Sequence, residues 1–179
     1  MWKSLSEKYD IRYTFLDIDD DLLHKLEDDI RKTGDVTYRR SNVKGTMTNW
    51  KTELKSFFKL ESEISKKIDN DVMYENHWGL IYRDGDHAIP HNHGTETLKI
   101  LEGESPPDLS FIFYIKTPEG SGVLHFLDED IYVEPEKNML IVFDPRVVHQ
   151  VFPNTVSGIE RVATAGNVYF SVDNVQEIR

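Results

Sequence analysis

Three histidines and one arginine are the residues of this sequence whose types and spacing could support metal and anion chemistry. His91 and His93 are two residues apart in the stretch AIPHNHGTETL, directly after Pro90. The proline favours an extended conformation at Ile89, and in an extended chain residues i and i+2 project to the same face. Both imidazoles can therefore reach one metal ion. The pair alone is weak support for a metal site, since two exposed loop histidines would have the same spacing.

A third candidate ligand is His149. Residues 139–143, MLIVF, form an apolar run typical of a strand buried on both faces, and Asp144-Pro145 then turns the chain. Residues 147–152 form the next strand, which ends at Pro153-Asn154. His149 is thus predicted in the middle of a strand, between apolar neighbours. The alternative is a core histidine that is bonded to a backbone carbonyl group.

Arg161 opens the following strand, in the stretch ERVATAGNVYF, on the same face as Ala163 and Ala165. A buried guanidinium is costly unless an anion pairs with it, preferably a carboxylate that it can grip with two hydrogen bonds. The small alanines leave room for such an anion. An ion pair with Glu134 or Glu160 is the competing explanation. If His149 and Arg161 lie on adjacent antiparallel strands of one barrel, they face the same cavity.

The elements that must position these residues begin with two helices. Residues 18–34 carry apolar side chains at helical spacing, with acidic residues in the first turn and Gly34 as the stop. Residues 49–68 predict a second, longer helix, in which Glu61 alone breaks the apolar stripe.

Strands follow from about residue 72, where the period changes to two and Val, Ile, Phe and Tyr dominate. Residues 94–107 predict a loop beside the histidine pair. We expect one domain over residues 1–179, with a helical support region (1–71) and a β core (72–171). Short strands at this spacing favour a sandwich or barrel with the two helices packed outside. The predicted strands are 75–83, 108–117, 122–127, 131–134, 139–143, 147–152 and 160–171, with 8–18 as a possible eighth.

The composition narrows the function classes. A net charge of −11 and a pI near 5.0 oppose binding to nucleic acid or to an anionic membrane surface. The absence of cysteine excludes disulfides, a thiol nucleophile and a cysteine-based zinc site. The start, MWKSLSEKYD, has no apolar signal region, so we expect a cytoplasmic protein. The oligomeric state is not encoded in any recognisable pattern.

Together these motifs resemble the catalytic core of the Fe(II)- and 2-oxoglutarate-dependent oxygenases, in particular a prolyl-hydroxylase-like branch. The resemblance rests on the order H-x-H, LSFIFYI, GSGVLHF, EPEKNMLIVFDPRVVHQVFPN and RVATAGN, and spans about residues 78–170. It implies a mainly β fold with flanking helices, in which a double-stranded β-helix, a jelly-roll or cupin-like barrel, encloses the iron. The cofactors implied are Fe(II), with 2-oxoglutarate and O2 as co-substrates.

By this resemblance His91 is the first iron ligand and His149 the distal one, while Arg161 binds the far carboxylate of 2-oxoglutarate. Tyr114 matches a tyrosine that bonds the same carboxylate in many relatives, although a half-buried barrel tyrosine fits equally well. His93 stands where the usual motif has Asp or Glu, and a neutral ligand there leaves the site one unit more positive. Other residues that could supply this ligand instead are Asp84, Asp86, His87 and Glu96.

The function implied is an oxygenase, most simply a hydroxylase, that couples oxidative decarboxylation of 2-oxoglutarate to oxidation of an unidentified substrate. One alternative is a cupin-like metalloenzyme with three histidine ligands and no 2-oxoglutarate. Another is a jelly-roll binding module without catalysis. The other histidines considered, His24, His77 and His125, are assigned to the surface or to packing.

Overall fold

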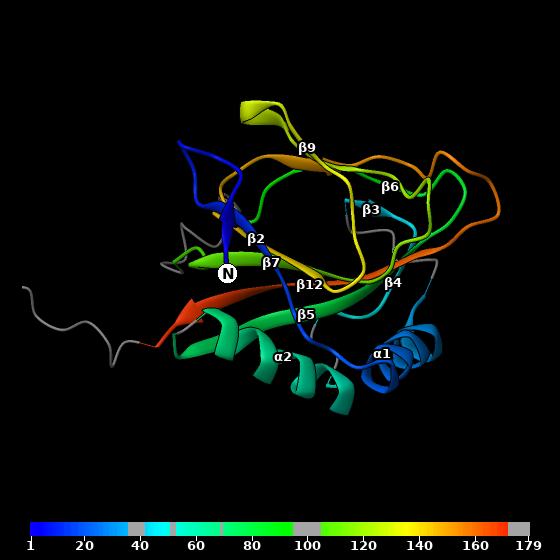
Figure 1. The fold of residues 1–179 in the computed structure, drawn as a ribbon, viewed down its shortest axis with the longest axis horizontal. Helices are drawn as coiled ribbons and strands as arrows, with labels where there is room; N and C mark the ends of the chain where they lie inside the picture. The colour runs from blue at the N-terminus through cyan, green and yellow to red at the C-terminus, as the bar shows by residue number, and fades with distance from the viewer. Residues whose placement is uncertain (36–41, 51–52, 69, 95–104, 172–179) are drawn as a thin grey trace, which may run out of the picture.

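The computed structural model describes residues 1–35, 42–50, 53–68, 70–94 and 105–171, and its strands form two sheets (Figure 1). The larger sheet has seven strands in the order β1-β2-β10-β7-β12-β5-β4, and the smaller has five in the order β3-β6-β11-β8-β9. All of the pairings between neighbouring strands are antiparallel. The bounds in the larger sheet are β1 Lys3–Ser4, β2 Ile11–Phe15, β10 Met139–Phe143, β7 Leu109–Lys116, β12 Arg161–Phe170, β5 Val72–Tyr82 and β4 Thr46–Met47. Those in the smaller sheet are β3 Val43–Lys44, β6 His87–His91, β11 His149–Val151, β8 Leu124–Phe126 and β9 Ile131–Val133, with a 3-10 turn at Leu127–Glu129.

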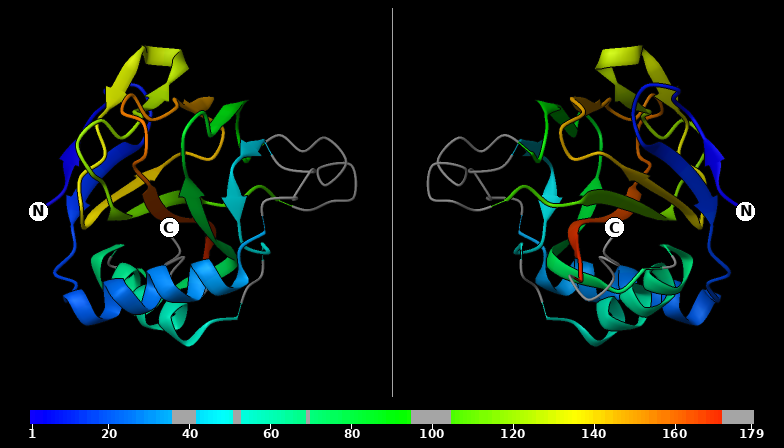
Figure 2. Two further views of the ribbon diagram at one scale, coloured as in Figure 1. Left: turned by 90° about the vertical axis from the view of Figure 1, so that its right-hand side faces the viewer. Right: turned by 90° about the vertical axis from the view of Figure 1, so that its left-hand side faces the viewer.

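Two helices cover the outer face of the larger sheet, α1 (Asp20–Thr33) and α2 (Lys55–Ile68). Figure 1 and both views of Figure 2 place them on the side of this sheet that faces away from the smaller sheet. The molecule therefore has three layers and two apolar cores, one beneath the helices and one between the sheets. The second core surrounds the candidate site.

Local sequence explains the bounds of α1 and its close approach to the sheet. The Asp19 side chain accepts a hydrogen bond from the backbone N–H of Leu22 at 2.7 Å and so caps the first turn. The N–H of Gly34 bonds the Ile30 carbonyl at 2.8 Å and ends the helix. A side chain at Gly79 of β5 would lie 2.3 Å from Ile30, so glycine is required where α1 packs on the sheet.

The predicted architecture of a mainly β protein with two helices packed outside is confirmed. Each predicted strand corresponds to an observed one, and residues 139–143 match β10 without a shift. The strands β1, β3, β4 and β6 were not predicted, because the first three have only two residues each and β6 lies in a polar stretch. Four strands, β1 to β4, come from residues 1–71, and the division of the chain into support region and core stays a prediction.

The predicted start of the second helix at residue 49 is wrong, since α2 begins at Lys55. Trp50 is held by other partners: its N–H bonds the Asn49 side chain at 2.8 Å, and its carbonyl accepts the N–H of His77 in β5 at 3.0 Å. The bond to the Asn49 side chain and the bond to β5 take the place of helical ones. Of the predicted loop 94–107, residues 95–104 lie outside the described residues.

Neither helix of the described ranges combines the length and the apolarity that a membrane crossing needs.

Candidate metal centre

Strand register brings the three histidines together. β11 pairs with β6 so that His149 lies directly opposite His91, and His93 follows two residues after the end of β6. One ring nitrogen from each histidine can be chosen so that all three lie within 4.8 Å of one another. In the part of the chain that the structure describes, this is the one cluster of three potential metal ligands.

Backbone carbonyls orient two of the rings. The Nδ1 atom of His91 lies 2.7 Å from the Ile89 carbonyl, and that of His149 lies 3.1 Å from the Val147 carbonyl. A carbonyl oxygen only accepts, so Nδ1 carries the hydrogen in both rings and Nε2 keeps its lone pair. Metal-binding histidines are commonly held in this way by a partner of the second nitrogen. The rings are therefore set for binding a metal through Nε2.

Burial keeps the three imidazoles neutral. It lowers the pKa of His149 to about 3 and that of His93 well below its ordinary value, with neighbouring histidines contributing in the same direction. Burial also lowers the pKa of His91. His93 is further confined by stacking, with ring centroids 5.1 Å from His149 and 5.9 Å from Trp78. At neutral pH a metal ion would thus meet three unprotonated ligands.

Three of the four other residues that could have replaced His93 as a ligand have hydrogen-bond partners away from the histidine cluster. Asp84 accepts hydrogen bonds from the Ser157 hydroxyl and from the N–H of Gly158, the latter at 2.8 Å. Asp86 accepts the N–H of Arg83 at 2.8 Å, and His87 bonds the Gly85 carbonyl at 2.9 Å. Glu96 lies outside the described residues.

Among the described residues, Arg161 is a buried cation without an anionic partner. Its side chain is fully enclosed, with the residue 1% exposed, and its guanidinium lies 4.6 Å above the ring of Tyr82. One nitrogen, Nη1, donates to the Gly122 carbonyl, whereas Nη2 is buried with no hydrogen-bond partner. Desolvation lowers the pKa of Arg161, although the guanidinium remains charged at neutral pH. Such an atom is placed to receive an anion from a ligand.

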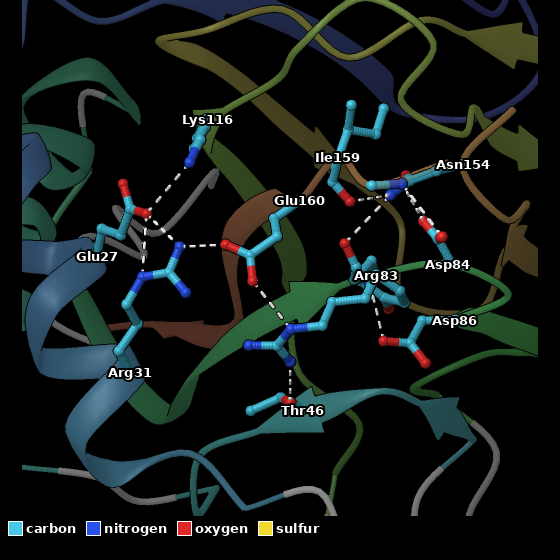
Figure 3. Close-up of polar contacts among 12 residues, drawn as sticks. Glu27, Arg31, Thr46, Arg83, Asp84, Asp86, Lys116, Asn154, Ile159 and Glu160 are labelled. Atoms are coloured by element: carbon cyan, nitrogen blue, oxygen red, sulfur yellow. Dashed lines mark hydrogen bonds and ion pairs between the residues drawn. The ribbon is translucent and has the colours of Figure 1, made fainter. Parts of the chain in front are cut away.

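The alternative prediction, an ion pair of Arg161 with Glu134 or Glu160, is wrong. Among the described residues Arg161 pairs with neither acid, and Glu160 pairs with Arg31 and Arg83. Figure 3 shows why for Glu160: its carboxylate bonds Arg31 of α1 and the Nε atom of Arg83, the latter at 2.9 Å. Arg83 in turn donates to Thr46 of β4 at 2.7 Å. The acid beside Arg161 is therefore held outside the barrel by two other arginines.

Tyr114 lies close to this cation. In the pairing of β7 with β12, Tyr114 lies opposite Ala163 on the inner face of the sheet. Ala163 is two residues after Arg161 in the same strand. The residue is 1% exposed, and burial raises the pKa of its hydroxyl to about 12 while the charge of Arg161 acts in the opposite direction. Tyr114 is thus a neutral donor next to an unpaired cation.

The expectation that His149 and Arg161 lie on adjacent strands is wrong. β11 belongs to the smaller sheet and β12 to the larger, so the two side chains face one interior from opposite sheets. An apolar cavity, here called the inner pocket, runs from the histidines to Tyr82, over which Arg161 lies. It is lined by the three histidines together with Leu80, Tyr82 and Phe143, among others.

Sequence reasoning missed a second cavity, the outer pocket, on the other side of the same histidines. Its lining includes His91 and His93, and also Trp50, Asn76, Trp78 and Asn167. The two pockets share His91, His93 and Trp78, so they meet at the histidine cluster. Asn167 ends the RVATAGN motif, which was the one available indication of this pocket.

The remaining histidines have structural roles or lie at the surface, as predicted. His77 is buried and bonds Glu61 at 2.9 Å, which explains why α2 carries an acid in its apolar stripe. His125 is also buried; it bonds Asp130 at 2.9 Å and stacks on Tyr132. His24 lies on the exposed face of α1.

Comparison with solved structures shows what the fold is. A viral collagen prolyl hydroxylase from Paramecium Bursaria Chlorella virus-1, solved as a 2OG complex, matches with a TM-score of 0.67 and 14% identity, over 92% of this chain and 98% of that one. A prolyl-4-hydroxylase from Pseudomonas putida matches at 0.63 and 16%, over 92% and 94%. The non-heme alpha ketoglutarate dependent epimerase SnoN from nogalamycin biosynthesis matches at 0.65 and 10%, over 91% and 78%.

No protein-family model and no curated protein matches this chain in sequence. The structural matches span nearly the whole chain and show that it has the double-stranded β-helix fold of the 2-oxoglutarate-dependent oxygenases. The predicted fold class is thereby confirmed.

Proposed function

We propose that this protein is an Fe(II)- and 2-oxoglutarate-dependent oxygenase that hydroxylates a substrate still to be identified. The observation that carries the proposal is the buried, unpaired Nη2 atom of Arg161, which faces the same interior as three neutral histidines. A metal site alone would fit many enzymes, whereas a metal site whose neighbouring pocket reaches Tyr82, over which a buried cation lies, fits a dicarboxylate co-substrate.

The residues present fit this cofactor. His91, His93 and His149 would hold Fe(II), which when bound supplies O2 activation and the coupled decarboxylation of 2-oxoglutarate to succinate. Imidazole is a suitable ligand for iron, and the carbonyl partners of His91 and His149 keep the ring orientation constant.

The chain's own part is binding and orientation. Arg161 would grip the far carboxylate of 2-oxoglutarate with its guanidinium, and Tyr114 would donate its hydroxyl hydrogen to the same group. Both residues are only 1% exposed, so these interactions act in a medium of low dielectric constant. The three neutral ligands leave a more positive site than the usual pair of histidines with one carboxylate, which strengthens attraction for the dianion.

One observation favours a second candidate. His93, rather than an acid, occupies the third ligand position, and sites with three histidines also serve cupin-like metalloenzymes that do not use 2-oxoglutarate. For such an enzyme Arg161 would have no carboxylate to bind.

Anaerobic addition of Fe(II) and then 2-oxoglutarate separates these possibilities. A metal-to-ligand charge-transfer band, and succinate formation once O2 is admitted, are expected for the wild type and lost in His149→Ala and Arg161→Ala. His24→Ala, at an exposed histidine of α1, is the matched control and should behave as wild type. Metal binding without a response to 2-oxoglutarate would favour the three-histidine alternative, and no metal binding would favour a non-catalytic jelly-roll module.

We also propose that the protein is cytoplasmic and binds neither nucleic acid nor membrane. The support is its acidic composition, with 32 acidic against 21 basic residues, which repels polyanionic surfaces.

A further inference from the structure

A bulge in β5 turns two neighbouring side chains into the outer pocket. In the pairing of β5 with β12, Asn167 lies opposite Asn76 but the next residue, Val168, lies opposite Tyr74, so Glu75 is the extra residue. The alternation of faces reverses there. Asn76 and Trp78 face the outer pocket, as strand alternation requires, whereas Tyr74 packs under the helices. Glu75, which would otherwise point away, lines the outer pocket beside Asn76.

A chain of buried hydrogen bonds sets the direction of the Asn76 amide. The Ser110 hydroxyl donates to Oδ1 of Asn167 at 2.7 Å, and Nδ2 of Asn167 donates to Oδ1 of Asn76 at 2.9 Å. The Nδ2 group of Asn76 then faces Glu75, with its nitrogen 3.5 Å from the carboxylate Oε2. The reversed amide would place its oxygen against that carboxylate, which would repel it. Asn76 therefore presents N–H groups.

The donor of Asn76 and the acceptor of Glu75 form a complementary pair. Their separation of 3.5 Å is at the limit of a hydrogen bond, so the direct contact is weak and a ligand can bond both groups with better geometry. A carboxylate has several lone-pair sites and can accept from a ligand in addition to its other partners. A group with C=O and N–H side by side matches this pair.

The surroundings set the remaining chemistry of a ligand. The tilted indoles of Trp50 and Trp78, with ring centroids 5.5 Å apart, offer an apolar wall suited to a flat or ring-shaped group. Among the described residues that line this pocket there is one acid, Glu75, and no lysine or arginine. These described side chains suit a ligand that donates a hydrogen bond to Glu75 and accepts one from Asn76.

We propose that Glu75 and Asn76 determine the specificity of this site for an uncharged primary carboxamide or cyclic amide, bound by its C=O to Asn76 and by its N–H to Glu75. The inference rests on the proposed function, since it makes this amide the primary substrate, held against the histidine cluster through the outer pocket. An ordinary peptide bond does not fit, because its trans geometry directs C=O and N–H to opposite sides. The amide is either a glutamine or asparagine side chain or a small ring compound.

Three benzene derivatives with one ring and different polar groups test the pair: benzamide, benzoate and N,N-dimethylbenzamide. Binding is followed by quenching of tryptophan fluorescence in the full chain, first without metal and then with Fe(II) and 2-oxoglutarate under anaerobic conditions. Trp50 and Trp78 line the pocket, while the third tryptophan, Trp2, bonds the Lys67 carbonyl and supplies a constant background. We expect benzamide to bind the metal-free protein at least tenfold more tightly than the other two, because neither benzoate nor the dimethyl compound has an N–H to donate to Glu75.

Two variants remove one group each. Glu75→Gln and Asn76→Ala should each weaken benzamide binding about tenfold, the loss expected for one hydrogen bond. Glu119→Gln, at an exposed acid outside the lining of the outer pocket, is the matched control for Glu75→Gln and should bind as wild type. If Asn76→Ala fails to fold, Glu75→Gln at the half-exposed position still decides the question. Equal binding of the three compounds, unchanged binding in Glu75→Gln, or no quenching by benzamide would each overturn the proposal.

The charge-transfer band separates this result from failure of the proposed function. A band without quenching by benzamide would sink the amide proposal alone, and quenching without a band would sink the oxygenase proposal while leaving an amide-binding pocket. A comparison of 2-pyridone with a glutamine-containing peptide, measured in the same way, then distinguishes a ring compound from a protein side chain, and tighter binding of either supports the proposal.

Discussion

Replacement of Arg161 by methionine should lower 2-oxoglutarate affinity sharply while it changes stability little. The guanidinium is buried, lacks an anionic partner and leaves Nη2 without a hydrogen bond. Replacing such a group by an apolar side chain of similar length is often neutral or stabilising, by about 1–4 kcal/mol. Against this, the Gly122 carbonyl loses its donor, at a cost of about 1–3 kcal/mol. The two effects are of similar size and opposite sign, so the unfolding free energy should change by no more than about 1 kcal/mol.

The affinity for 2-oxoglutarate should fall sharply in the same variant. Truncation of one partner of a buried, hydrogen-bonded charge pair costs about 2–5 kcal/mol. This corresponds to a loss of about 30-fold to several thousandfold in the dissociation constant. Arg161→Lys keeps the charge but not the planar fork, so its affinity should lie between those of wild type and Arg161→Met.

Thermal unfolding with and without Fe(II) and 2-oxoglutarate measures both effects. A ligand present at 100 times its dissociation constant stabilises the folded state by about 2.7 kcal/mol, which for a chain of this size raises Tm by roughly 5–11 °C. In the wild type, 2-oxoglutarate should raise Tm beyond the value reached with Fe(II) alone. In Arg161→Met this additional rise should be absent. A strongly destabilised Arg161→Met with unchanged affinity for 2-oxoglutarate would refute the reasoning, since the arginine would then be a structural ion-pair residue.

Three further predictions concern the surroundings of the site. Tyr114→Phe should weaken 2-oxoglutarate binding about tenfold, measured by titration of the charge-transfer band, with little change in Tm; equal affinities would remove Tyr114 from the binding site. The hydrogen bond from Arg31 lowers the pKa of Glu160 below 4.5. The contribution of Glu160 to the stability of the folded state is therefore fully present above pH 4.5, and it is lost as the pH falls through the lower pKa of the folded protein. Glu160→Gln should therefore cost about 1 kcal/mol at neutral pH and flatten the loss of stability in acid, as seen in urea unfolding at several pH values; parallel curves for both proteins would contradict this. Gly79→Ala places a methyl group against α1 and should destabilise the fold by about 1–3 kcal/mol in the same measurement, whereas an unchanged midpoint would show that the helix moves freely.

Local patterns in the sequence were sufficient to predict most of the fold. The alternation of Val, Ile, Phe and Tyr sets which residues of a strand face the core, and it placed β7, β10 and β12 nearly as observed. Helical spacing, an acidic first turn and Gly34 did the same for α1. These rules act between residues a few positions apart, so no tertiary contact is needed to apply them. The same rules failed at the start of α2, where the hydrogen bond from His77 of β5 to the Trp50 carbonyl holds Trp50 outside the helix.

The sequence by itself also indicated which residues to combine at the site: an H-x-H pair with both rings on one face, a buried histidine and a buried arginine. Only the tertiary structure decided how they meet. His149 lies opposite His91 through the register of β11 with β6, and Arg161 faces them from the other sheet.

The partners of charged groups were likewise decided by the tertiary structure. Glu160 is next to Arg161 in the chain, yet it bonds Arg31, 129 residues away on α1, and so leaves the buried arginine available to a ligand. The bulge at Glu75 is a second case, because one extra residue between two paired strands reverses which side chains reach the pocket. Register, bulges and ion-pair choice depend on competition among residues far apart in sequence, and that competition is resolved only when the sheets and helices pack.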